Sequence, residues 1–229
     1  MDTALTTGAI AEQQRFITKV FGWMSVALVV SGVAAFFVAS SPSAMGIIFG
    51  NPLVFYGLLG FELLMVIVLT WAINKISAEI ATALFILYAI TTGLTLSVIF
   101  LIYTVSSITS TFFVTALTFA AMALHDYTTK RDLTTMGNFL IMALIGLILA
   151  SVVNIFWNNS TLYWITTYAG VLIFIGLTAY DTQKIKERNI LGNEGTSEDR
   201  KESILGALTL YLDFINLFLY LLRILGRRK

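Results

Sequence analysis

Seven apolar stretches, each about as long as a membrane is thick, dominate this sequence. A bilayer core about 30 Å thick is crossed by roughly 20 helical residues. Of the 229 residues 58% are hydrophobic and only 12% are charged, too few charges to cover a soluble fold of this size. The sequence therefore predicts an all-α integral membrane protein with seven transmembrane helices. The predicted spans are Ile17–Ser40, Pro52–Ile73, Ile80–Thr104, Thr111–Thr128, Asn138–Trp157, Tyr163–Gln183 and Leu205–Leu225.

Positively charged residues alternate from one loop to the next. The N-terminal region and every second loop contain Lys or Arg, whereas the loops between them contain none. By the positive-inside rule, the N-terminus and loops two, four and six are predicted to be cytoplasmic. We therefore expect one transmembrane domain, residues 1–229, with a cytoplasmic tail at 1–15 and a cytoplasmic loop at 184–204. The basic residues behind this prediction are Arg15, Lys19, Lys75, Lys130, Arg131, Lys184, Lys186, Arg188, Arg200 and Lys201.

The C-terminal end does not follow the alternation. Seven crossings place it outside the cell, yet it contains Arg223, Arg227, Arg228 and Lys229. Either the last segment re-enters without crossing, or earlier helices set the topology and the late charges are tolerated. We favour seven crossings because the last segment is long enough to span the bilayer.

Two aspartates are predicted at membrane depth, where ionisable residues are expensive and are functional candidates. Asp213 lies within LTLYLDFINLFLYLLR and Asp181 near the end of the preceding span, so both fall in the inner half of the membrane. Adjacent carboxylates cannot both ionise cheaply, and such a pair titrates as a unit. Ionised, it would offer oxygen ligands to a cation such as Ca²⁺. The alternatives are a structural hydrogen bond at Asp213, near Asn216, and an interfacial pair between Asp181 and Lys184.

Two further places contain titratable residues near or within the predicted spans. Glu62 lies in the middle of the second span and is either part of an ion pathway or coupling step, or a structural, neutral glutamic acid. His125 and Asp126 close the fourth span, and we interpret them as an interfacial pair rather than a pH sensor. Neither place identifies a function without knowing which groups surround it.

Several function classes are excluded or disfavoured by composition. The chain has no cysteine and one histidine, which excludes thiolate and histidine-cluster metal sites. A net charge of +1 argues against a nucleic-acid partner. No HExxH sequence, serine–histidine–acid arrangement or glycine-rich aspartyl-protease motif is present. We therefore predict a protein that is not an enzyme and has no resident cofactor.

Two signature-like segments, YDTQKIK at 180–186 and SILGALTLYLDFINLFLYLLRILG at 203–226, resemble those of the Bax inhibitor-1 (transmembrane Bax inhibitor motif) family. The resemblance extends through TTGLTLS at 91–97 and ALIGLILASVVNIF at 143–156, and is strongest to the bacterial inner-membrane branch. It implies a seven-helix bundle with the last helix central. It also implies that Asp181 and Asp213 form a pH-sensing latch for a calcium leak, with Lys75 as a weak candidate for a basic partner.

Two functions from different classes follow from these observations. The first is a pH-sensitive calcium leak channel, in which the aspartate pair binds calcium ions and protons. The second is an interaction protein that modulates a membrane-bound protease or a stress response through the N-terminal tail or the 184–204 loop. A proton-coupled transporter that uses Glu62 is a weaker third hypothesis. Each places the chain in the lipid bilayer of the bacterial inner membrane.

Overall fold

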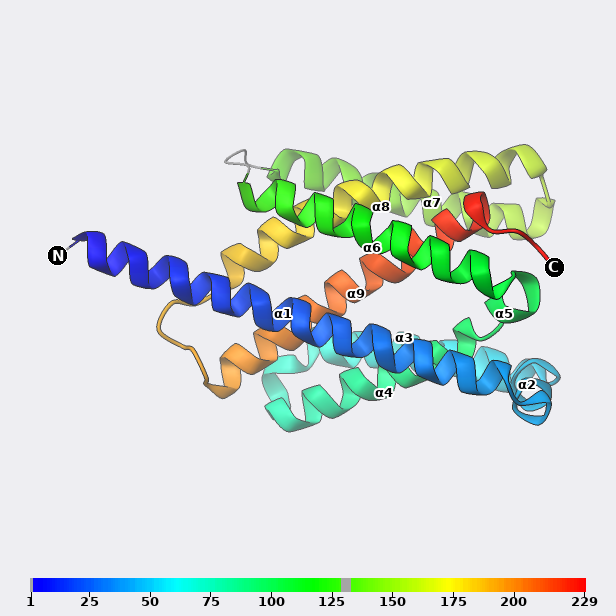
Figure 1. Cartoon of the computed structure of the whole chain (residues 1–229), viewed down its shortest axis with the longest axis horizontal. Coiled ribbons are helices and arrows are strands. Elements are labelled where there is room, and N and C mark those ends of the chain that lie inside the picture. The colour runs from blue at the N-terminus through cyan, green and yellow to red at the C-terminus, as the bar shows by residue number, and fades with distance from the viewer. Residues whose placement is uncertain (1, 129–132) are drawn as a thin grey trace. The chain divides into compact units, whose positions relative to one another are not determined.

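The computed structural model describes the backbone of residues 2–128 and 133–229, and the side chains of residues 8–124 and 133–229. These residues are helical apart from short connections (Figure 1). The helices are α1 (Asp2–Ala39), α2 (Pro42–Phe49), α3 (Pro52–Trp71), the 3-10 helix η1 (Ile73–Lys75), α4 (Ala78–Leu96), α5 (Ile99–Ile102), α6 (Val105–Thr128), α7 (Thr134–Trp157), α8 (Ser160–Arg188) and α9 (Ser197–Leu225).

Seven segments of the described chain are long and apolar enough to cross a membrane. They are α1 from Gly8 onward, α3, α4 together with α5, α6 as far as Leu124, α7, α8 and α9. The prediction of an all-α membrane protein with seven candidate spans is therefore confirmed. Because α9 is one continuous helix of 29 residues, the structure gives no support to a re-entrant last segment.

The chain forms two compact units. The first unit contains Met1–Ile102, Lys186–Tyr211 and Lys229, and the second contains Tyr103–Ile185 and Leu212–Arg228. Helix α9 contributes its N-terminal part to the first unit and its C-terminal part to the second. The expectation of a single domain over 1–229 stays a prediction.

Local capping sets the starts of α2 and α3. The short helix α2 begins with Pro42, and the side chain of Ser41 accepts a hydrogen bond from the backbone N–H of Ala44 at 3.3 Å. Helix α3 begins with Pro52, and Asn51 caps it in the same way. Proline is favoured in the first turn, where its missing N–H has no partner to lose. The sequence analysis missed α2 because eight residues are too short to register as a span.

Helices α8 and α9 both extend beyond the predicted spans, so the loop expected at 184–204 is reduced to residues 189–196. Hydropathy marks the thickness of the membrane, not the length of the helix. The charges at both ends favour the extension, since the last turn of α8 contains Lys186 and Arg188 and the first turn of α9 contains Glu198 and Asp199. The predicted tail 1–15 is likewise mostly helical, because α1 begins at Asp2.

Close packing of α1 against α4 organises the first unit. A Cβ atom added at Gly93 would lie 2.5 Å from the carbonyl oxygen of Ser31, so only glycine permits this approach. The Ser31 hydroxyl donates to the carbonyl of Ala89 at 2.7 Å and shares a hydrogen bond of 2.6 Å with the hydroxyl of Tyr211. Tyr211 is fully buried and meets Phe85 edge-on. The N-terminal part of α9 is thus held by α1 and α4.

Aromatic and aliphatic contacts hold the C-terminal part of α9 in the second unit. Phe214 packs against Phe112 and Phe119 of α6, with ring centroids 5.3 and 5.6 Å apart. Leu217 joins a buried cluster with residues of α7 and α8 that includes Leu140 and Ile173. Helix α9 has the most buried apolar window of the candidate spans, at 56%, and the expectation that it is central in the bundle stays a prediction.

Candidate functional site

Helices α8 and α9 bring Asp181 and Asp213 together within the second unit. The side chain of Asp213 forms a hydrogen bond with that of Asp181. Two ionised carboxylates repel each other and neither can donate, so this hydrogen bond requires that one of them carries a proton. The structure therefore brings together, as a carboxyl pair, the two residues predicted from the sequence, and their role as a latch stays a prediction.

The side chain of Asp213 is almost completely buried. Its exposure is 5%, and its Oδ2 atom has no hydrogen-bond partner among the described residues. Asp181 is less buried. A carboxylate oxygen without a partner in an apolar setting is costly, and the cost is lowest when the group is protonated or binds a cation. An Asp213 side chain in these surroundings is therefore a candidate for exchanging a proton or a cation.

Neighbouring polar side chains on α8 and α9 are engaged elsewhere. The hydroxyls of Thr178 and Thr182 donate to the carbonyls one turn earlier in α8, both at 2.7 Å. The amide of Asn216 donates to the carbonyl of Leu212 at 2.8 Å, so its donor group is used within its own helix. The ammonium of Lys184 lies 5.4 Å from the centroid of the Tyr180 ring. A pathway role for Asn216 stays a prediction.

Glu62 belongs to α3 in the first unit and is half-buried. Its Oε1 atom accepts a hydrogen bond of 3.0 Å from the hydroxyl of Thr95 on α4. Thr95 lies within TTGLTLS, and its hydroxyl bonds across helices. Glu62 is thus a further carboxyl group within a candidate span, and it has an uncharged partner.

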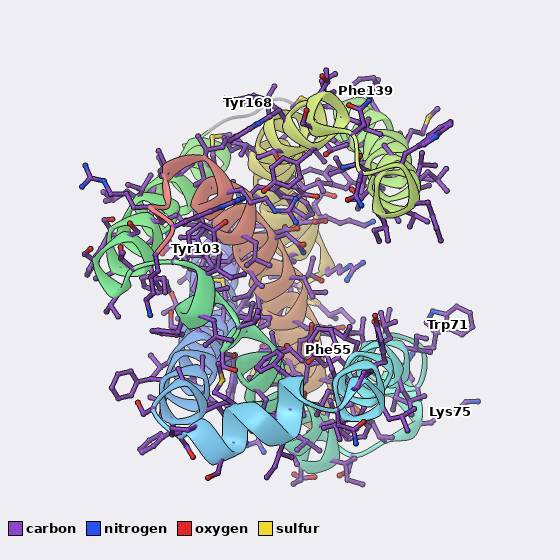
Figure 2. All side chains as sticks on the ribbon, turned by 90° about the vertical axis from the view of Figure 1, so that its right-hand side faces the viewer. Phe55, Trp71, Lys75, Tyr103, Phe139 and Tyr168 are labelled. Atoms are coloured by element: carbon purple, nitrogen blue, oxygen red, sulfur yellow. The ribbon has the colours of Figure 1, made fainter. Side chains whose placement is uncertain are left out.

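The remaining candidates stay predictions. Lys75 is exposed, and Figure 2 shows its side chain extending away from the ribbon. No ion pair joins it to another residue of the described chain, and it belongs to the first unit. Its role as a latch partner stays a prediction. The expected pair of His125 and Asp126, together with the basic residues of loop four, lies outside the residues whose side chains are described.

A set of polar contacts on the loop between α8 and α9 was missed by the sequence analysis. The ammonium of Lys19 lies 2.7 Å from Oδ2 of Asp199, which also accepts the backbone N–H of Gly195 at 2.9 Å. The guanidinium of Arg15 donates two hydrogen bonds of 2.8 Å to Glu194, and this contact lowers the pKa of Glu194. No periodicity or motif could have revealed partners so distant in sequence.

Metal-ligating side chains do not cluster in the described part of the chain. No three of its His, Cys, Asp or Glu residues are grouped so that they could bind one metal. A stably bound Ca²⁺ takes six to eight oxygen ligands, more than the two carboxyl groups supply by themselves. Binding of calcium by the pair stays a prediction.

Comparison with known proteins shows the family to which this chain belongs. The family model described as "Inhibitor of apoptosis-promoting Bax1" matches residues 13–229. The chain belongs to the Bax inhibitor-1 family. The family assignment made from the two signature segments is therefore confirmed, and both Asp181 and Asp213 lie within the matched region.

Bacterial relatives match nearly the full length of the chain. The Escherichia coli K12 protein named "Inner membrane protein YbhL" is 53% identical over 217 residues, which is 94% of this chain and 93% of the relative. An uncharacterized protein of Borreliella burgdorferi is 46% identical over 217 residues, 95% of this chain and 94% of that protein. A Rickettsia prowazekii protein is 43% identical over 220 residues, with 94% and 91% covered.

Proposed function

We propose that this Bax inhibitor-1 family protein is a pH-sensitive calcium leak channel gated by the Asp181–Asp213 pair. The observation that carries the proposal is the buried hydrogen bond between the two carboxyl groups, with one oxygen of Asp213 left without a partner in the described chain. A structural aspartate would be expected to have all its oxygens satisfied. A titrating one keeps a position free for the proton or the cation that it exchanges.

The gating step follows from the charge of the pair. With one proton shared, the carboxyl groups hold α8 and α9 together through a hydrogen bond. With that proton lost, two negative charges repel at short range and attract a divalent cation. The two protonation states thus differ in both helix contact and cation affinity, which is what a pH-sensitive gate requires.

The central test is calcium flux into proteoliposomes at a series of pH values. The native chain should pass Ca²⁺ at a rate that changes with pH. Asp213→Asn and Asp181→Asn, which keep the shape of the side chain but cannot carry the charge, should each remove most of that pH dependence. Native protein that passes no Ca²⁺ at any pH would overturn the proposal.

Glu62 is proposed to assist ion passage without setting the pH response. It is half-buried and bonded to Thr95, so it can bind a cation briefly while Thr95 fixes its orientation. Glu62→Gln should lower the calcium flux and leave its pH profile in place. A shifted profile in this variant would instead make Glu62 part of the gate.

We also propose that the chain lies in the bacterial inner membrane with its N-terminus in the cytoplasm. The name of the E. coli relative and the alternation of basic loops support this. Because the chain has no cysteine, single cysteines can be introduced without background. A cysteine at Leu191 should react with an impermeant thiol reagent only in inverted vesicles, and one at Ser160 only in intact cells.

The second candidate function is modulation of a membrane-bound protease or of a stress response through the cytoplasmic loop. It is favoured by the contacts that fix this loop, because Glu12 accepts the backbone N–H of Gly192 at 2.7 Å and Gln13 donates to the carbonyl of Lys186 at 3.0 Å. An ordered polar surface outside the spans is suited to a protein partner. Removal of residues 1–14 should then abolish co-purification of a protease, whereas Asp213→Asn should not.

A further inference from the structure

A cavity of about 530 Å³ lies in the second unit where α7 and α9 end and α8 begins. Arg223 and Arg228 line it, together with three asparagines, Asn154, Asn158 and Asn159, and with aromatic side chains. None of its lining residues is acidic. The cavity is separate from the aspartate pair, because α9 places Arg223 ten residues beyond Asp213, about 15 Å along the helix.

The guanidinium of Arg223 is held in place by aromatic rings. Its central carbon lies 5.0 Å from the ring centroid of Tyr220 and 5.5 Å from that of Tyr163. Contact with aromatic faces orients a guanidinium while leaving its N–H groups at the edge available as donors. Neither Arg223 nor Arg228 forms an ion pair with any residue of the described chain. Two positive charges therefore face the cavity without a counter-charge there.

The asparagines add donors to this positive site. The side-chain oxygen of Asn154 accepts the backbone N–H of Asn159 at 2.9 Å, and the side-chain oxygen of Asn159 accepts that of Leu162 at 3.0 Å. With both oxygens used in this way, the part of each side chain that remains for a ligand is its NH₂ donor group. Guanidinium and amide donors in one cavity match an oxyanion, not a cation.

The position of the cavity relative to the membrane indicates which anion it binds. Candidate spans end at Trp157 and begin again at Ser160, so this end of the unit reaches the level of the lipid headgroups. Phe156 and Trp157 are 85% and 79% exposed, and Trp164 stacks on Tyr168, as in an aromatic belt at a membrane interface. At this level the abundant oxyanion is the phosphate of a phospholipid.

We propose that this cavity binds the phosphate group of a phospholipid headgroup, with Arg223 and Arg228 supplying the charge. The proposal also accounts for the basic C-terminal end that the positive-inside rule left unexplained. The end is fixed in the second unit, where the backbone N–H of Arg227 donates to the hydroxyl of Ser107 at 3.0 Å and that of Thr104 donates to the carbonyl of Arg227 at 3.1 Å. Positive charge is retained there because it has a ligand.

The test is native mass spectrometry of the full chain in detergent, titrated with phosphatidylglycerol. The native protein should bind it in preference to diacylglycerol with the same acyl chains, which lacks the phosphate. Arg223→Gln and Arg228→Gln should each weaken binding about tenfold, the effect of losing one charge-assisted hydrogen bond. Arg227→Gln is the matched control, because it removes the same charge from the same segment but does not line the cavity.

Two results would contradict the proposal. Equal weakening in Arg227→Gln and Arg228→Gln would show a response to net charge alone and overturn the proposal. Inorganic phosphate that binds the lipid-free protein as tightly as phosphatidylglycerol would make the site one for a free anion and overturn the lipid assignment. If Arg223→Gln does not fold, exposed Arg228 still tests the site, since its substitution leaves the packed Tyr163–Arg223–Tyr220 stack in place.

Discussion

Two aspartates on α9 are equally buried and have opposite surroundings. Asp199, in the first unit, is 3% exposed and is neutralised by Lys19 at 2.7 Å. Asp213, in the second unit, is 5% exposed and has another carboxyl group, Asp181, as its hydrogen-bond partner. The first arrangement pairs a carboxylate with a cation, and this contact joins α9 to α1. In the second, two carboxyl groups cannot both ionise without repulsion. Burial alone therefore does not distinguish the two aspartates, whereas the charge of the partner does.

The largest expected loss of stability comes from replacing Lys19, the cation that pairs with Asp199. Lys19→Gln leaves a buried carboxylate without its counter-charge and should lower the free energy of unfolding by about 1–2 kcal/mol, a range that allows for the partial exposure of Lys19. Thermal unfolding in detergent measures this change. A variant as stable as the native chain would show that the backbone N–H of Gly195 suffices for Asp199, and the contrast with Asp213 would weaken.

A smaller effect is expected when the two aspartates themselves are neutralised. Asp199→Asn releases Lys19, which can turn toward solvent, and should cost about 1 kcal/mol. Asp213→Asn removes a carboxyl that no cation neutralises among the described residues, so its unfolding free energy should stay within about 0.5 kcal/mol of the native value. Their effects on the pH dependence of calcium flux should be reversed. Asp213→Asn should lose this dependence, and Asp199→Asn should keep it. Equal losses of stability would break the distinction drawn between the two sites.

The smallest expected effect is the pH response of the loop between α8 and α9. The Arg15 guanidinium lowers the pKa of Glu194, so this contact contributes stability above the unfolded pKa of about 4.3 and loses it as pH falls through the lower folded value. A spin label on a cysteine at Leu191 should show the same mobility from pH 8 to pH 5 and greater mobility below about pH 4. In Arg15→Gln the label should already be mobile at pH 7. A label whose mobility rises between pH 8 and pH 5 would point to a different titrating group.

The aspartate pair could be predicted from the sequence because the membrane restricts where the two residues can lie. The two spans that contain Asp181 and Asp213 are consecutive, and the basic loop between them places both residues toward the same side. Sequence reasoning could not reach Lys19 as the partner of Asp199, because the two residues lie on helices distant in sequence. It could not reach Thr95 as the partner of Glu62 either, because hydropathy does not say which faces of α3 and α4 meet. The contact of Arg223 with Tyr163 on α8 was beyond it for the same reason. Each of these contacts joins side chains whose approach depends on how neighbouring helices pack.

The amino-acid sequence by itself determined that this chain is a helical membrane protein with seven candidate spans, because lipid accepts only backbone that satisfies its own hydrogen bonds over about 20 apolar residues. It also restricted the chemistry to carboxylates, arginines and hydroxyls, since cysteine is absent and histidine occurs once. The tertiary structure alone decided which carboxylate has a cation as its partner and which has another carboxylate. That choice depends on side-chain contacts over a few ångströms, which interhelical packing sets and hydropathy does not encode.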